Sequence, residues 1–331
     1  MKSVYLCATP RHLIMTLLHS QSANRQATIV LTAYSEALWN FFNSLRGKLA
    51  TWEGVSEVHV LRRRRAADYT FLARWLDRRF IRDHLGSYRL VNFLWLPQSL
   101  VFASQYFFAA ADSAVFLEDA PTMSNALPEQ GLRRALRKLV LGIDHEFWTS
   151  PKLSEIWVSN PDAFPNFPRE KMRRLTVDLA TISLDQAAVD RLLTLFGVTI
   201  HNFLGRRPGA PAVLVLAQPI SSSVGRAITR SSQRRIFSAL AQHYHDLGYT
   251  VLFKRHPRDD LDYELEPSIA TLPRFLPSEM LRFLPLNLDT AVSLASSGIL
   301  GTGAVRSINA DPAFPSHRNL SRTLEAIRAL R

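Results

Sequence analysis

Residues 250–258 read TVLFKRHPR, and this stretch decides the fold class. Tyr249–Phe253 is β-branched and apolar, and it follows a helical pattern over Gln233–Asp246 and a break at Gly248. Helix, glycine and buried strand in that order are typical of a βαβ unit in a parallel sheet. Ligands of open α/β sheets bind at the carboxyl ends of the strands, so a site is expected just after this strand.

The expected site is cationic and has one histidine at its centre. Pro257 disfavours the α region for the residue before it and so holds His256 extended. A single histidine is more often structural than catalytic, but a buried structural histidine rarely has cations on both sides. Those cations lower the imidazole pKa, so we expect His256 to give up a proton only to a bound anion. The flanking cations are Lys254, Arg255 and Arg258.

A second apolar strand, Ala291–Ala295, runs into Ser296, Ser297 and Gly298. Two hydroxyls and a glycine at the start of a helix offer O–H donors, free backbone N–H groups and a helix dipole to an anion. An ordinary helix cap is an equally good interpretation of the two serines. If both segments act together, they predict a site for a phosphate-bearing leaving group.

Strand and helix patterns alternate at the spacing of βαβ units. The first part has expected strands at Val4–Ala8, Ala27–Thr32, Val55–Leu61, Tyr88–Leu96, Ala114–Leu117 and Glu155–Val158. Its expected helices are His12–Ser22, Ser35–Leu49, Tyr69–Leu85, Gln98–Ala111, Gln130–Leu141 and Ser183–Leu195. This predicts a Rossmann-like domain over residues 1–205.

A second alternation follows the Gly- and Pro-rich segment 205–211, GRRPGAP, which is typical of a linker. Its expected strands are Val213–Ala217, Tyr249–Phe253, Ala291–Ala295 and a last one near Gly298–Gly301. We expect a second Rossmann-like domain over 206–312 and a C-terminal helix within 313–331 that packs back on the first domain. The predicted fold is therefore α/β, with two Rossmann-like domains facing each other across a cleft.

The net charge of +12 leaves three interpretations. Nucleic-acid binding is the least favoured, because the chain has no zinc-ligand spacing and no RNP-like segment. Attraction to an anionic membrane surface and a merely solvated basic surface are about equally favoured. The basic clusters are Arg62–Arg65, Arg78-Arg79 with Arg82, and Arg133-Arg134 with Arg137-Lys138.

The single cysteine, Cys7, excludes an internal disulfide framework and fits a reducing compartment. The first residues are interrupted too soon for a signal peptide or anchor, and no run of about 18 apolar residues occurs. We expect a cytoplasmic protein.

Glu118 and Asp119 follow a short apolar strand and form a second group of interest. A helix cap is the commoner use of an acid before Pro121. As a catalytic pair, one carboxylate would deprotonate an acceptor hydroxyl. The chain has no P-loop and no Asp-x-Asp pair in an obvious metal position, which favours metal-independent chemistry without a resident cofactor.

Taken in order, Glu118-Asp119, His256-Pro257 and Ser296-Ser297 resemble the (D/E)(D/E)G, HP and SS motifs of bacterial sialyltransferases. The stretches YLCATPRHL, FKRHPR and LPSEM are most similar to glycosyltransferase family 52, the lipooligosaccharide sialyltransferases, and to capsular polysialyltransferases. The resemblance implies a GT-B fold and an inverting, metal-independent transfer of sialic acid from CMP-sialic acid to a sugar hydroxyl. Few residues carry it, but they span most of the chain.

The resemblance also assigns roles to residues. Asp119 or Glu118 would be the general base, and His256 would protonate or hydrogen-bond the phosphate of departing CMP. The donor side would include Lys254, Pro257, Glu279 at the ribose, and Ser296, Ser297 and Gly298 at the phosphate. The acceptor-side candidates are Thr9, Pro10 and Arg11.

Three departures from the family pattern matter. Ala120 stands where the motif has glycine, so the turn after the carboxylates can differ. Members of family 52 can also carry an aspartate in the loop after the strand that opens the second domain. Here that loop, Ala217–Ile220, has no acid, so the role of general base returns to Glu118-Asp119. Without an N-terminal anchor, attachment to the inner membrane face would rest on the basic clusters.

The sequence therefore predicts a cytoplasmic sialyltransferase acting on lipooligosaccharide or capsule, without nucleic-acid partners. One alternative keeps the fold and changes the donor to another CMP-activated acidic sugar such as Kdo, or to another nucleotide sugar. A second alternative is a non-catalytic basic protein that binds polyanions.

Overall fold

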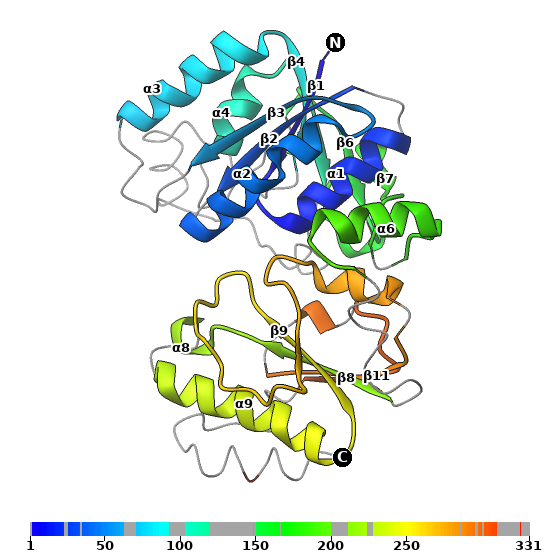
Figure 1. Cartoon of the computed structure of the whole chain (residues 1–331). Coiled ribbons are helices and arrows are strands. Elements are labelled where there is room, and N and C mark those ends of the chain that lie inside the picture. Colours follow the sequence, from blue (N-terminus) through cyan, green and yellow to red (C-terminus); the bar gives the residue numbers. More distant parts are fainter. Residues whose placement is uncertain are drawn as a thin grey trace. The chain divides into compact units, whose positions relative to one another are not determined.

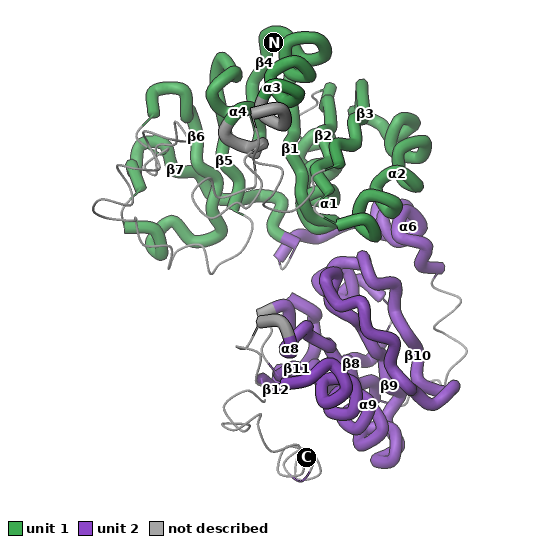
Figure 2. The backbone as a smooth tube through the Cα atoms, turned by 90° about the vertical axis from the view of Figure 1, so that its left-hand side faces the viewer, with its two compact units in different colours: residues 1–178 green, residues 179–331 purple. Residues whose placement is uncertain are grey.

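The structure is a computed structural model of the chain. It describes residues 2–22, 26–33, 35–62, 71–92, 103–118, 148, 150–165, 167–179, 181–199, 211–223, 228–284, 286–294, 297–299, 301–309 and 325. The chain divides into two compact units, unit 1 (residues 1–178) and unit 2 (residues 179–331), shown in Figure 2. The division falls earlier than the boundary expected at 205/206, because residues 179–199 belong to unit 2.

Unit 1 is built on a parallel sheet in the order β3-β2-β1-β4-β5-β6-β7. Strand β1 lies between β2 and β4, with Val4 opposite Thr28 and Leu90. The strand order reverses at β1, so the carboxyl ends of β1 and β4 form the switch point at which this fold class binds ligands. The strands are β1 (Lys2–Cys7), β2 (Ala27–Ala33), β3 (Val55–Arg62), β4 (Tyr88–Asn92), β5 (Ser113–Leu117), β6 (Leu153–Val158) and β7 (Met172–Arg174).

The helices of unit 1 begin at residues that can cap them. Thr9 Oγ1 accepts the backbone N–H of His12 at 3.1 Å, and the Ser35 side chain accepts that of Leu38 at 3.2 Å. Pro10 takes the first helical position, where its missing N–H costs nothing. The helices are α1 (Pro10–Ser22), α2 (Glu36–Ala50), α3 (Phe71–Phe80) with a π-helical turn (Ile81–Leu85), and α4 (Ala103–Ala110).

Both faces of this sheet are buried. Tyr5 and Cys7 point to α1, with Tyr5 Oη 2.9 Å from His19 Nδ1 and Cys7 Sγ 3.1 Å from Thr16 Oγ1. Side chains alternate along a strand, so their neighbour Leu6 packs on the other face, in the core cluster that holds Phe107 of α4. Burial raises the pKa of Cys7 to about 12, as fits a core thiol.

Unit 2 holds a second parallel sheet, in the order β10-β9-β8-β11-β12. Its order again reverses at a central strand, β8, whose neighbours are β9 and β11. The strands are β8 (Ala212–Ala217), β9 (Thr250–Arg255), β10 (Ala270–Thr271), β11 (Leu288–Ser293) and β12 (Arg306–Asn309). The predicted α/β class, with two Rossmann-type units, is therefore confirmed.

Helix α9 (Arg230–Asp246) covers one face of this sheet (Figure 1). Its residues Ile236, Phe237 and Leu240 share a core cluster with Val215 and Phe253. The other described helices of unit 2 are α6 (Gln186–Leu195) and the short α8 (Ile220–Ser223). Two 3₁₀ segments are η7 (Ser278–Phe283) and η8 (Ser297–Ile299).

The structure corrects two details at the end of unit 2. The strand expected near Gly298–Gly301 is absent from the described residues of that range. Ser297–Ile299 form the turn η8, and the strand beside β11 is β12. A short apolar segment can bury its side chains as a strand or as a 3₁₀ turn, so the sequence pattern could not distinguish the two conformations. The predicted helix Gln130–Leu141, the linker 205–210 and most of the C-terminal segment lie outside the described residues.

Candidate active site

The sheet of unit 2 brings the predicted histidine and serine segments to the same edge. His256 follows β9, and Ser297 opens the turn after β11. Both strands flank β8, so their carboxyl ends lie two strand spacings apart, about 10 Å. Ser296 and the side chain of Ser297 lie outside the described residues, so their contact with a phosphate remains a prediction.

The serine segment does not open a helix as the sequence suggested. Ser297–Ile299 is a single 3₁₀ turn that contains Gly298. Three residues align too few peptide dipoles to act as a helix N-terminus. Any anion binding here would rest on hydroxyl and backbone N–H groups.

His256 is oriented by its own loop. The backbone N–H of Arg258 donates to Nδ1 at 3.0 Å, and the backbone N–H of Asp259 donates to the His256 carbonyl at 2.9 Å. Burial, with Arg258, Lys254 and Arg274 nearby, lowers the pKa of His256 to about 4, so the ring is neutral at pH 7.

The protonation of His256 follows from these contacts. A neutral ring whose Nδ1 accepts a hydrogen bond carries its proton on Nε2. No acceptor for that proton is found among the described groups. His256 can therefore donate a hydrogen bond to a ligand without first being protonated.

Lys254 is a buried cation beside this histidine. Its side chain lies on the face of β9 opposite to Phe253, and the residue is 5% exposed. The Nζ atom donates to the carbonyls of Arg255 and Arg274 at 3.3 and 3.4 Å. Burial lowers the pKa of Lys254 to about 8, while the Glu279 carboxylate opposes that shift. Lys254 thus keeps most of its charge at pH 7.

Glu279 belongs to η7, which lies against η8. The Ser278 hydroxyl donates to its Oε2 at 3.3 Å. The side chain crosses directly over the backbone of Gly301, where an added Cβ would lie 2.7 Å from Glu279 Cγ. The absence of a side chain at Gly301 therefore leaves the space that Glu279 occupies next to the turn that holds Gly298.

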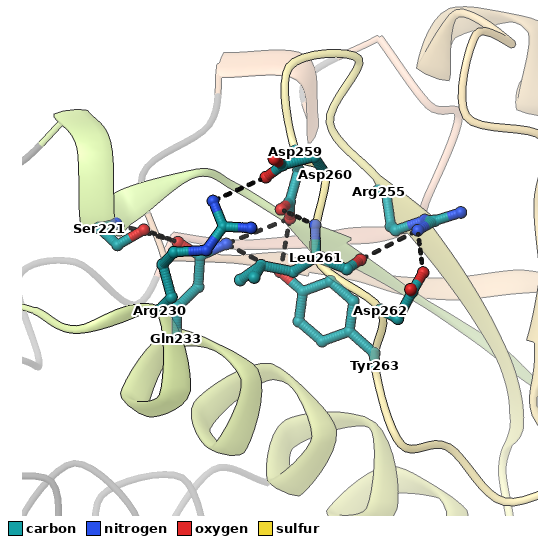
Figure 3. A network of polar contacts seen from close by, with 9 residues as sticks. All are labelled: Ser221, Arg230, Gln233, Arg255, Asp259, Asp260, Leu261, Asp262 and Tyr263. Atoms are coloured by element: carbon teal, nitrogen blue, oxygen red, sulfur yellow. Dashed lines mark hydrogen bonds and ion pairs between the residues drawn. The ribbon is translucent and has the colours of Figure 1, made fainter. Parts of the chain in front are cut away.

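A polar network anchors the loop that carries His256 (Figure 3). Asp259, 1% exposed, accepts the Tyr263 hydroxyl at 2.5 Å and the Gln233 amide at 3.2 Å on one oxygen. Its other oxygen accepts the backbone N–H of Leu261 at 3.1 Å. Asp259 also donates its own N–H to the carbonyl of His256, so the network reaches the candidate site.

The same network reaches two other segments. Gln233, on α9, accepts the backbone N–H and the hydroxyl of Ser221, on α8, at 3.0 and 2.8 Å. Arg230 pairs with Asp260 at 2.9 Å (Figure 3). The loop after β9 is thus tied to the segment after β8 and to the start of α9. Sequence analysis did not single out Asp259, Gln233 or Tyr263; the only local signal was a run of acids after the proline.

The acceptor-side candidates of unit 1 lie at the switch point of its sheet. Thr9 caps α1 and Pro10 is its first residue. The Arg11 guanidinium lies 3.9 Å from the Asp178 carboxylate, and both side chains are largely buried. These contacts give the three residues structural roles; contact with an acceptor stays a prediction.

The carboxylate pair is described only in part. Glu118 is 2% exposed, and its Oε2 accepts the backbone N–H of Ser159 at 2.5 Å. Its Oε1 is buried and has no hydrogen-bond partner among the described groups. Asp119 lies outside the described residues. Glu118 is therefore a buried residue that links the ends of β5 and β6.

The described part of the chain lacks two further features. No group of three or more His, Cys, Asp or Glu side chains there is arranged to hold a metal ion. No described helix is both long enough and apolar enough to cross a membrane.

No family model matches the chain, and no curated protein matches it. Among solved structures, it is similar to one described as "Crystal Structure Analysis of the Glycotransferase of kitacinnamycin". The TM-score is 0.44 and the sequence identity 10%, over 99% of this chain and 83% of the other. A likeness this distant carries no weight, so the fold class rests on the strand orders above.

Proposed function

We propose that this chain is a glycosyltransferase whose unit 2 binds the nucleotide part of a nucleotide-sugar donor. The observation that carries the proposal is the neutral His256 at the carboxyl edge of the sheet, with its Nε2 proton directed to no described acceptor. Buried Lys254 and the nearby Glu279 add a cation for a phosphate and an acceptor for ribose hydroxyls.

The donor we propose is CMP-sialic acid, and the acceptor a hydroxyl of lipooligosaccharide or capsule. The acceptor oxygen bonds to the anomeric carbon while the bond from that carbon to the phosphate oxygen breaks, which inverts the configuration. A carboxylate takes the hydroxyl proton, and His256 donates a hydrogen bond to the departing CMP. No metal ion is invoked in this scheme.

Within the carboxylate pair, Asp119 is the better base. Glu118 is buried and one of its oxygens already binds the backbone of Ser159, so it is poorly placed to touch an acceptor. We therefore expect D119N to abolish transfer and to leave CMP binding unchanged. Full activity in D119N together with loss in E118Q would reverse this assignment.

We further propose that the protein works in the cytoplasm at the inner membrane face, where a glycolipid or capsule acceptor is presented. The net charge of +12 is consistent with attraction to an anionic surface.

A thermal-shift titration with CMP, UMP, UDP and GDP, with and without EDTA, tests the donor. A ligand that binds only the folded state raises the melting temperature. We expect a shift with CMP alone that EDTA does not change. A response to UDP or GDP would keep the glycosyltransferase and discard the CMP-sugar.

A hydrolysis assay separates the remaining alternatives. Release of CMP from CMP-sialic acid, but not from CMP-Kdo, would support the sialyltransferase, and the reverse would favour the Kdo donor. No shift with any nucleotide and no hydrolysis would support a non-catalytic polyanion-binding protein.

A further inference from the structure

Helix α3 carries an exposed apolar pair on a basic surface. Four large apolar side chains are exposed among the described residues, and two of them are neighbours on this helix: Trp75, 47% exposed, and Leu76, 51% exposed. The other two, Leu247 and Val305, lie apart in unit 2, one directly after α9 and the other directly before β12. An adjacent exposed pair that includes a tryptophan indicates an interaction surface, because exposed apolar patches usually mark a site that binds a protein, a membrane or a ligand.

The described side chains of α3 and of the turn after it show which side of the helix faces the core. Asp77 and Ile81 are buried, and Phe80 packs against the core of unit 1. These positions are three or four residues apart and so occupy one side of a helix. Trp75 and Arg79, four residues apart, lie together on the opposite side, and Figure 1 shows α3 at the outside of unit 1.

Three arginines follow the apolar pair on this helix and on the turn after it. Arg79 stacks on Trp75, with its guanidinium carbon 5.3 Å from the ring centroid, and Arg78 lies 5.7 Å from the ring of Tyr106. Arg79 and Arg82 are 56% and 75% exposed, and both pair with Asp83. Three arginines and one aspartate leave this face with a net charge of +2 (3 − 1).

We propose that the α3 face, defined as Trp75, Leu76, Arg78, Arg79 and Arg82, docks on an anionic lipid bilayer. Trp75 and Leu76 would enter the interface between headgroups and acyl chains, and the arginines would lie at the lipid phosphates. A nucleic acid would use the arginines but gain little from Leu76. An acidic protein surface could also use a tryptophan and arginines, and the vesicle experiment below separates it from a bilayer. The inference deepens the membrane attachment proposed above and rests on it. It is independent of the proposed reaction, because it involves no residue of the candidate active site.

Co-sedimentation of the full chain with vesicles tests this surface. We expect binding to phosphatidylcholine vesicles that contain phosphatidylglycerol, weak binding to pure phosphatidylcholine, and release of the protein by about 0.5 M salt. W75S/L76S should lower the partition coefficient at least about tenfold, since two buried apolar side chains are lost. R79Q/R82Q should lower it on anionic vesicles only.

Two variants in unit 2 serve as matched controls. L247S changes a residue of equal exposure, and R235Q removes an exposed arginine elsewhere; both should bind vesicles as the unaltered chain does. A blue shift of tryptophan fluorescence on anionic vesicles should disappear in W75F. All variants should keep the melting temperature, because the changed side chains are exposed.

Three results would overturn the proposal. The first is equal binding of W75S/L76S and the unaltered chain. The second is an equal loss in L247S. The third is binding to single-stranded DNA or heparin with no binding to vesicles, which would assign the basic surface to a soluble polyanion.

Discussion

At the residue scale, His256 combines burial, nearby cations and an oriented ring. Its pKa of about 4 in the folded chain lies below the ordinary histidine value of 6.5. Between these values the unfolded chain binds the extra proton, so the free energy of unfolding falls as the pH drops from 6.5 to 4. Below pH 4 His256 is protonated in both the folded and the unfolded chain, so this residue lowers the free energy of unfolding no further.

This behaviour gives a pH prediction for H256Q. Glutamine cannot be protonated, so the variant should lose less stability than the unaltered chain between pH 6.5 and 4. Urea unfolding at several pH values would measure the difference. Parallel pH curves for the two proteins would mean that His256 is not held neutral.

The chemical role of His256 is tested by comparing two substitutions. H256A should lower kcat by about 10²–10⁴ if the ring acts on the leaving group. H256Q places an amide N–H near the position of Nε2 and should recover part of that loss if hydrogen bonding is sufficient. Equal loss in both would indicate that a proton, and not only a hydrogen bond, is transferred.

Gly301 offers a test of Glu279 without changing its charge. In G301A the new Cβ would lie 2.7 Å from Glu279 Cγ and displace the side chain. We expect the KM of G301A for the donor to rise about 10- to 100-fold, because loss of a hydrogen bond to a charged group weakens binding by about that factor. E279Q should show a similar rise.

The matched control for this test is G47A. Gly47 lies in α2, where an added Cβ meets nothing within 4 Å. Its KM should be unchanged and its stability equal or slightly higher, since alanine is the better helix former. An unchanged KM in G301A would remove Glu279 from the donor site.

At the scale of elements, the Asp259 network connects the loop after β9 to α8 and α9. In D259N an amide replaces one of the carboxylate oxygens that accept from Tyr263, Gln233 and Leu261, so one buried donor loses its partner. The cost should be about 1–3 kcal/mol, with a melting temperature several degrees lower.

D259N should also lower the affinity for the donor, because the His256 carbonyl accepts the backbone N–H of Asp259 and the network therefore holds the loop of the candidate site. D262N is the control: this carboxylate is 96% exposed and pairs only with Arg255 among the described contacts. D262N should keep both stability and CMP affinity. If D259N loses stability but binds CMP normally, the network holds the fold and not the site.

At the scale of the whole molecule, we expect CMP to slow hydrogen exchange in unit 2 and to leave the strands of unit 1 unaffected. Hydrogen exchange should slow on CMP binding in residues 217–223, 255–263, 276–284 and 297–303, which lie around the carboxyl edge of the sheet in unit 2. The strands of unit 1 should be unchanged by CMP alone. Protection confined to the β1–α1 segment would move the nucleotide to unit 1.

The sequence by itself determined the α/β class and the place of His256. Apolar strand patterns and helical periodicity report which side chains are buried, and this depends on near neighbours. Thr250–Arg255 is therefore a strand and His256 follows it, as the pattern predicts. The same patterns located the strands that hold Glu118 and the serine segment at their carboxyl ends.

Only the tertiary structure decided how those residues are used. Gln233 and Asp259 meet across 26 positions of sequence, and Glu118 reaches Ser159 across 41, so no local pattern reveals either contact. The turn at Ser297–Ile299 and the neutral state of His256 likewise depend on which groups pack nearby. Protonation and hydrogen bonding follow from the surroundings of a side chain, and distant segments create those surroundings when the sheet assembles.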